Sequence, residues 1–165
     1  MSEGERFDRL PQSETADADP PSREAVLRWW TERFGIAPDV FATHDLWERG
    51  SGKIWAARSD ISLESPIAIE ALGLFILRTR GEHWKPTLEA VQRFGHHATK
   101  NVLHLGAADA RAFLAGKDQE VEWDGDWGYL IITHEIAGGP EPIGVGLFTQ
   151  GVLRSQVPKG RRREF

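Results

Sequence analysis

The chain ends in a run of cations whose chemistry suits phosphate. The run consists of Lys159, Arg161, Arg162 and Arg163. Guanidinium groups make forked hydrogen bonds to phosphate oxygens, and Gly160 lets the backbone approach a nucleic-acid strand closely. The fixed φ of Pro158 holds the run in one direction. This end of the chain therefore predicts phosphate contacts, and the alternative is a solvated terminus whose charges serve solubility.

A second group of candidates lies between residues 78 and 100, where five bases outnumber two acids. Alternation along a strand places Arg78 and Arg80 on one face, where they either extend a basic strip or pair with local carboxylates. Lys85 and Thr87 lie at a predicted helix start, which favours an anion, and Thr87 either binds phosphate or caps the helix. Trp84 lies in the same basic stretch and is a candidate for stacking on an unpaired base.

The net charge of −5 is distributed unevenly. Residues 1–20 contain six acids and two bases and so carry −4 of it, leaving the remaining 145 residues nearly neutral. Their composition, poor in apolar residues, predicts a disordered acidic tail. A basic face and an acidic face on the rest of the chain would orient it on a polyanion despite the net charge.

Other chemistries find little support. The chain has no cysteine, which excludes disulfides and thiolate chemistry. The spacing of His83, His96, His97 and His104 does not suit a metal, so we expect neither metal nor cofactor. We interpret Asp124 and Asp126 as part of a solvated turn, and we expect Trp123 and Trp127 to pack beneath it. We expect Gly144 and Gly146 to permit a tight bend or close approach by RNA backbone.

The elements that must position these residues follow from periodicity and from glycine and proline punctuation. Ser22 caps a helix that carries Val26, Leu27, Trp30 and Phe34 and ends at Gly35. Trp30, Trp47 and Trp55 fall on apolar faces and are expected in the core. Helices are also predicted from Pro86 to Gly95 and over 107–114, and strands over 41–47, 53–58, 71–79, 102–105, 128–134, 142–148 and 151–157. The pattern predicts an α+β fold resembling a small mixed barrel.

The order of these segments resembles the PUA-like RNA-binding region at the carboxy terminus of Sun-type (Fmu-type) RNA cytosine-5 methyltransferases, over roughly residues 70–163. The matching stretches are Lys85-Pro86-Thr87, residues 94–102, Phe113-Leu114-Ala115-Gly116, Gly128-Tyr129-Leu130-Ile131, residues 142–146 and Val157-Pro158-Lys159-Gly160-Arg161-Arg162. The resemblance places Lys100 and Asn101 near the RNA groove. It implies a PUA-like domain over 69–165, preceded by a helix and strands over 21–68 and by the tail over 1–20.

Sun-type enzymes also carry a domain that binds S-adenosylmethionine and supplies catalytic cysteines, for which this sequence has neither the residues nor the length. We therefore expect a non-catalytic RNA-binding protein. Its expected partners are rRNA or tRNA, with ribosomal proteins or a separate RNA-modifying enzyme beside them. No apolar run suits a membrane, and a cytoplasmic location in ribosome biogenesis is expected.

Two other hypotheses remain open. The acidic tail and the loop from Trp123 to Trp127 could bind a basic partner, which would make the chain a protein-interaction adaptor in ribosome assembly. A small enzyme acting on RNA is the third reading, and it would require a pocket with coupled titratable groups.

Overall fold

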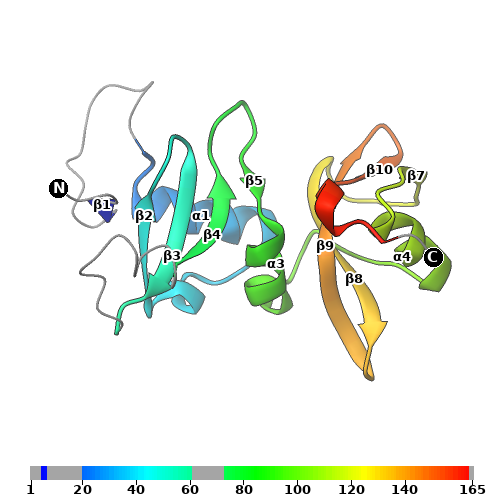
Figure 1. Ribbon diagram of the computed structural model, residues 1–165, viewed down its shortest axis with the longest axis horizontal. Helices are drawn as coiled ribbons and strands as arrows, with labels where there is room; N and C mark the ends of the chain where they lie inside the picture. Colours follow the sequence, from blue (N-terminus) through cyan, green and yellow to red (C-terminus); the bar gives the residue numbers. More distant parts are fainter. Residues whose placement is uncertain (1–4, 7–19, 61–72, 164–165) are drawn as a thin grey trace.

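The computed structural model describes residues 20–60 and 73–163, and the backbone of Glu5 and Arg6. Within these residues the chain forms two five-stranded sheets and three α-helices (Figure 1). The first sheet contains β1 (Glu5–Arg6), β2 (His44–Glu48), β3 (Lys53–Arg58), β4 (Leu74–Arg78) and β5 (Lys85–Pro86). The second contains β6 (Val102–His104), β7 (Gln119–Glu120), β8 (Gly128–Ile136), β9 (Gly139–Thr149) and β10 (Val152–Ser155). The helices are α1 (Arg23–Phe34), α3 (Leu88–Phe94) and α4 (Ala107–Leu114).

Helix α1 begins and ends where the sequence predicts. The Ser22 hydroxyl accepts a hydrogen bond from the Ala25 amide, and Gly35 closes the helix in the left-handed region at φ 66°. Three residues four apart, Val26, Trp30 and Phe34, are fully buried. The helix therefore presents one apolar face to the first sheet.

All strand pairs of the first sheet are antiparallel and follow one another in chain order. The strand predicted over 41–47 begins later than expected, because Phe41 ends a short 3-10 helix, Pro38–Phe41, that starts at a proline. Pro86 lies in β5 and not in the following helix. The cap of α3 is Thr87, so the predicted helix start moves by two residues.

The second sheet has the order β6-β8-β9-β10-β7. Strand β6 pairs parallel to β8, and α4 belongs to the connection between these two strands. Strands β8 and β9 form a long antiparallel hairpin that turns at Ala137 and Gly138, both with positive φ. Among the described strands no pairing joins the edges β6 and β7, so the mixed α+β class is confirmed in the form of two sheets.

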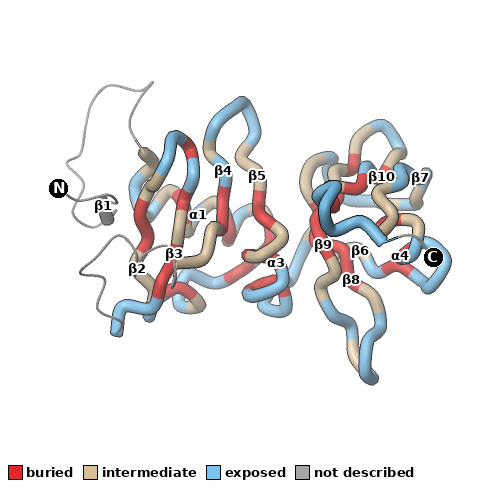
Figure 2. Tube along the Cα trace, viewed as in Figure 1, coloured by how far each residue is buried: buried red, intermediate tan, exposed pale blue. Residues whose placement is uncertain are grey.

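Helix α3 lies between the two sheets and contacts β4 on one side and β9 on the other. The largest buried cluster joins α1, the first sheet and α3, and it includes Ile131 and Val145 from the second sheet. A smaller cluster centred on Phe113 and Leu153 lies under α4. Figure 2 shows buried residues along the strands of both sheets. The molecule therefore has a core that crosses from one sheet into the other.

The predicted division at residues 68–69 falls outside the described residues, as does nearly all of the predicted tail over 1–20, and both stay predictions. Strands β4 and β5, which follow that division, pair within the first sheet. The described residues of the strand predicted over 71–79 do form β4, whose Ile76 and Leu77 are buried.

The structure corrects several expectations about aromatic and glycine residues. Trp30 and Trp47 are buried as predicted, whereas Trp55 is half-buried. Trp127 is 58% exposed, so it does not pack beneath its loop, although Trp123 packs against the smaller cluster. A Cβ at Gly144 would lie 2.8 Å from the Phe113 ring, so this glycine makes room for the protein's own core. Gly146 does the same beside Leu153.

Candidate nucleic-acid interface

Three cations form a row across the first sheet. Arg78 of β4 lies directly opposite Lys53 of β3 and directly opposite Lys85 of β5. Register partners on adjacent strands lie about 5 Å apart with their side chains on one face. Like charges placed opposite one another destabilise a sheet, so this cation row is typical of a surface that binds an anion.

Lys85 connects the cation row to the second sheet. Its Nζ donates a 2.8 Å hydrogen bond to Oε1 of Gln156, which precedes Val157 and Pro158. Nζ also lies 6.0 Å from the ring centroid of Tyr129. Burial lowers the pKa of Lys85, and the charge of Arg78 lowers it further. Because both effects disfavour the ammonium form, an anion bound here would raise the pKa of Lys85 again.

The other predicted residues near the cation row have different surroundings. The Arg78 guanidinium lies 4.9 Å from the ring centroid of Phe75, and its side chain is exposed. Arg80 is exposed in the loop after β4 and donates to the Ser51 hydroxyl. Trp84 is half-buried and packs against the larger core cluster.

Two predicted residues use their polar groups within the protein. The Thr87 hydroxyl accepts from the Ala90 amide at 3.1 Å and donates to the Phe75 carbonyl at 2.6 Å, and the residue is only 8% exposed. Asn101 has a positive φ of 56°, and its Nδ2 donates to the Arg33 carbonyl at 2.5 Å. The neighbouring Lys100 is exposed at the C-terminal end of α1, where its amide donates to the Phe34 carbonyl. These contacts give Thr87 and Asn101 structural roles.

The basic end of the chain is packed against the fold up to residue 163. The Arg163 amide donates to the Leu114 carbonyl at the end of α4, and the Arg162 Nε donates to the Val157 carbonyl. Arg161 forms a 3.3 Å ion pair with Glu89 of α3. The side chains of Lys159 and Arg163 are exposed and make no hydrogen bond or ion pair with the described residues. Of the cations in this run, Lys159 and Arg163 are therefore the most available to bind a phosphate.

Sequence reasoning missed Lys53, because it follows a glycine turn and lies outside the basic stretch of residues 78–100. The signal was present in the predicted strand over 53–58, since an antiparallel partner would bring Lys53 opposite a residue near the end of the next strand. It also missed Tyr129, which lies far from Lys85 in the sequence.

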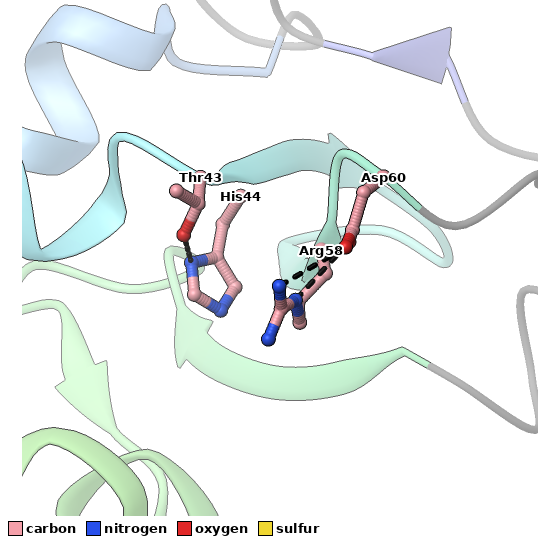
Figure 3. A network of polar contacts seen from close by, with 4 residues as sticks. All are labelled: Thr43, His44, Arg58 and Asp60. Atoms are coloured by element: carbon pink, nitrogen blue, oxygen red, sulfur yellow. Dashed lines mark hydrogen bonds and ion pairs between the residues drawn. The ribbon is translucent and has the colours of Figure 1, made fainter.

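The opposite end of β3 carries a separate polar cluster (Figure 3). Arg58 forms a two-pronged contact with Asp60, and this hydrogen bonding lowers the pKa of Asp60. His44 is half-buried, and its ring meets the ring of Phe94 at 5.4 Å in an edge-to-face contact. Burial lowers the pKa of His44, and so do the charges of Arg93, Arg58 and Arg23, against an opposing effect of Asp60.

Two further findings bear on the class of protein. The described part of the chain contains no group of three or more histidine, cysteine, aspartate or glutamate residues placed to hold a metal ion. Nor does any helix in that part have the length and apolar character needed to cross a membrane.

Comparison with known proteins gives matches at both ends of the chain. Residues 1–73 match a family of unknown function, DUF7122. Residues 100–163 match the PUA domain of methyltransferase RsmF, a narrower stretch than the 70–163 expected from the sequence motifs. The segment between the two matches contains β4, β5 and α3.

The curated relatives extend this likeness toward the N-terminus. The ribosomal RNA small subunit methyltransferase F of Aeromonas salmonicida is 23% identical over 144 residues, which are 84% of this chain and 28% of that protein. Its counterpart from Aeromonas hydrophila subsp. hydrophila is 25% identical over 137 residues, 82% of this chain and 27% of that protein. The chain thus spans little more than a quarter of the length of the relatives it matches. Its C-terminal part, residues 100–163, is a PUA-like region similar to the PUA domain of the methyltransferase RsmF.

Proposed function

We propose that this chain is a non-catalytic RNA-binding protein of the cytoplasm, which takes part in ribosome biogenesis or in the maturation of rRNA or tRNA. The observation that carries the proposal is the cation row of Lys53, Arg78 and Lys85, joined through Gln156 to the strand that leads into the basic terminus. The likeness of residues 100–163 to the PUA domain of an rRNA methyltransferase supports RNA as the polyanion.

The geometry favours recognition of the backbone of a folded RNA. The exposed members of the cation row, Lys53 and Arg78, offer charge and hydrogen-bond donors on the surface of the first sheet. Lys159 and Arg163 add two cations on the side of α3 and α4. Contacts of this kind fix position and orientation on RNA and carry no sequence information.

The proposal of a non-catalytic role rests on composition. Cytosine-5 methyl transfer of the Sun type uses cysteine nucleophiles, and this chain contains no cysteine. Incubation with rRNA and labelled S-adenosylmethionine should leave the RNA unlabelled. Label on cytosine above that of a protein-free reaction would contradict the non-catalytic role.

The binding test is a salt titration with a structured fragment of small-subunit rRNA, followed by fluorescence anisotropy. The variants are the double substitutions Lys53→Ala with Arg78→Ala, and Lys159→Ala with Arg163→Ala. Each lost phosphate contact should reduce the slope of log K against log salt by about 0.7–0.9. Both double variants should therefore bind more weakly and with less salt dependence than the wild-type chain.

The matched control is Arg58→Ala. Arg58 lies in the same strand as Lys53 but at its other end, about 16 Å away at the usual rise per residue, and it pairs with Asp60. This variant should retain affinity within about twofold and keep the wild-type salt slope. Absence of binding at low salt, or unchanged binding by both double variants, would refute the proposed function.

A further inference from the structure

A cleft of about 730 Å³ lies beside the cation row. Helix α1, the loop between β4 and β5, and the segment that enters β8 form its walls, together with residues of β9. Its aromatic lining comes from Trp29, Trp84, Trp127 and Tyr129. The volume lies within the range of small-molecule sites, and aromatic walls with a few polar groups are usual for such sites.

Trp127 is the most accessible of these rings, with 58% of the residue exposed. Its only described ring contact is with His83, at a centroid distance of 4.9 Å and an interplanar angle of 82°. A T-shaped contact occupies at most one face of a ring. An indole face is therefore available for a flat ligand to stack upon.

The backbone beneath Trp127 is held firmly. Arg33 of α1 donates from Nε to the Tyr129 carbonyl at 2.8 Å and from Nη1 to the Trp127 carbonyl at 3.4 Å. Nη2 of Arg33 is buried and has no hydrogen-bond partner among the described residues. These bonds hold the main chain of the cleft wall against the C-terminal end of α1, so the backbone that carries Trp127 is preorganised.

The cleft lining contains three carboxylates and two guanidinium groups, and these mixed charges suit an uncharged base better than an ion of either sign. Glu32, Glu82 and Asp126 lie in its lining, and their carboxylates repel an anion but accept hydrogen bonds from N–H groups. Guanine presents two adjacent donors, N1–H and the N2 amino group, which match the two oxygens of one carboxylate. Adenine and cytosine present one amino group beside a ring acceptor, and uracil presents no amino group.

The cleft is also connected to the cation row. Nζ of Lys85 lies 6.0 Å from the ring centroid of Tyr129, which lines the cleft. A strand with a phosphate at Lys85 would therefore lie close to the Tyr129 side of the cleft, and we expect a neighbouring base to reach it. Arg28 and Arg33 also line the cleft, and their charge disfavours an alkylammonium ligand in the same aromatic surroundings.

We infer that this cleft receives one unpaired base of a single-stranded RNA segment, with a preference for guanine, which stacks on Trp127 and donates to a carboxylate of the lining. This inference rests on the proposed RNA-binding function and adds a base-specific contact to it. It divides the interface into cations that hold the backbone and an aromatic cleft that reads one base.

The test uses the full chain and three fluorescent heptamers that differ only at the central position, which is guanosine, inosine or an abasic residue in a uridine context. Inosine lacks the N2 amino group. The wild-type chain should bind the guanosine heptamer most tightly. Trp127→Ala should weaken that binding by between about fivefold and 150-fold, and should change binding of the abasic heptamer by less than twofold.

Two further variants locate the carboxylate. Glu82→Gln or Asp126→Asn should remove the preference for guanosine over inosine, while the salt slope stays at its wild-type value because no phosphate contact changes. Ile136→Ala is the control, since Ile136 is 49% exposed at the other end of β8. Trp127→Phe should retain most of the affinity by stacking, and thermal melting verifies that each variant is folded.

The outcomes separate this inference from the proposed function. Salt-dependent binding of structured rRNA together with no effect of Trp127→Ala on the guanosine heptamer would overturn the base site and leave the proposed function intact. Equal binding of all three heptamers would also overturn the base site. So would Trp127-dependent binding of a trimethyllysine peptide in preference to the guanosine heptamer. No binding of any RNA at low salt would overturn both.

Discussion

The Asn101 side chain donates a hydrogen bond of 2.5 Å from Nδ2 to the carbonyl oxygen of Arg33. Asn101 precedes the first strand of the second sheet, and Arg33 lies in the last turn of α1. The guanidinium of the same Arg33 donates to the Tyr129 carbonyl of β8. The C-terminal end of α1 is thereby tied to the second sheet through two groups of one residue.

Asn101 is expected to matter for its backbone as well as its side chain, because its φ is 56°. Asn101→Ala loses the hydrogen bond and replaces asparagine, which tolerates the left-handed region, with alanine, which tolerates it less well, at a cost of about 1–3 kcal/mol. Asn101→Gly loses only the hydrogen bond and should be about 1 kcal/mol more stable than the alanine variant. Urea unfolding measures both, and equal stability of the two variants would contradict this account.

Gly144 is expected to tolerate no side chain. Gly144→Ala brings a Cβ to 2.8 Å from the ring of Phe113, which is fully buried and has little room to shift. The free energy of unfolding should fall by about 1–3 kcal/mol. Gly139→Ala, in the same strand but with no atom within 4 Å of the added Cβ, should change it by no more than about 0.5 kcal/mol. If Gly139→Ala lowered the free energy of unfolding as much as Gly144→Ala, the lack of space beside Phe113 would not be the cause of the destabilisation.

Thr87 is expected to act as a helix cap and not as a phosphate ligand. Thr87→Ala removes the bonds to the Ala90 amide and the Phe75 carbonyl and should cost about 1–2 kcal/mol. Thr87→Ser keeps the hydroxyl and should recover most of that loss. The salt slope of RNA binding should be unchanged in both variants, and a slope reduced by one contact would restore Thr87 as a ligand.

His44 should make stability depend on pH, because its pKa in the folded chain is lowered from the ordinary value near 6.5. The unfolded chain then binds more protons than the folded chain as the pH falls below about 6.5. The stabilisation is complete above that pH and is lost as the pH falls toward the folded pKa. Comparing unfolding free energies at pH 7.5 and 5.5 should show a smaller decrease in His44→Gln than in the wild-type chain. An undiminished decrease in that variant would assign the effect to other groups.

The elements that sequence reasoning predicted well carry their signals locally. Helix α1 has a serine cap, a glycine stop and apolar residues four apart, so its bounds follow from neighbours in the sequence. The hairpin of β8 and β9 likewise follows from the glycines of its turn and from the β-branched and aromatic residues of its strands. The expectation of a PUA-like region also succeeded, because the order of several short motifs carries more information than any one of them.

The features that sequence reasoning missed depend on pairings between distant segments. Strand β5 has only two residues, and its alignment with β4 places Lys85 opposite Arg78. Trp127 lies in the segment before β8, outside any helix or strand, so no periodicity in the sequence could predict its exposure. The candidate RNA-binding residues were therefore chosen by clustering in the sequence and by the resemblance. This choice included Thr87 and Asn101, whose side chains bond within the fold, and omitted Lys53, which lies opposite Arg78.

The cluster that contains Ile131 and Val145 of the second sheet together with Val26 and Trp30 of α1 limits how this chain can be divided. A fragment beginning at residue 100 would expose those two side chains to water and would lose Arg33 as the donor to Tyr129. The described parts of the two matched segments therefore share one buried cluster, and we expect them to unfold together. Transplanting the PUA-like half onto another protein would require carrying α1 and α3 with it.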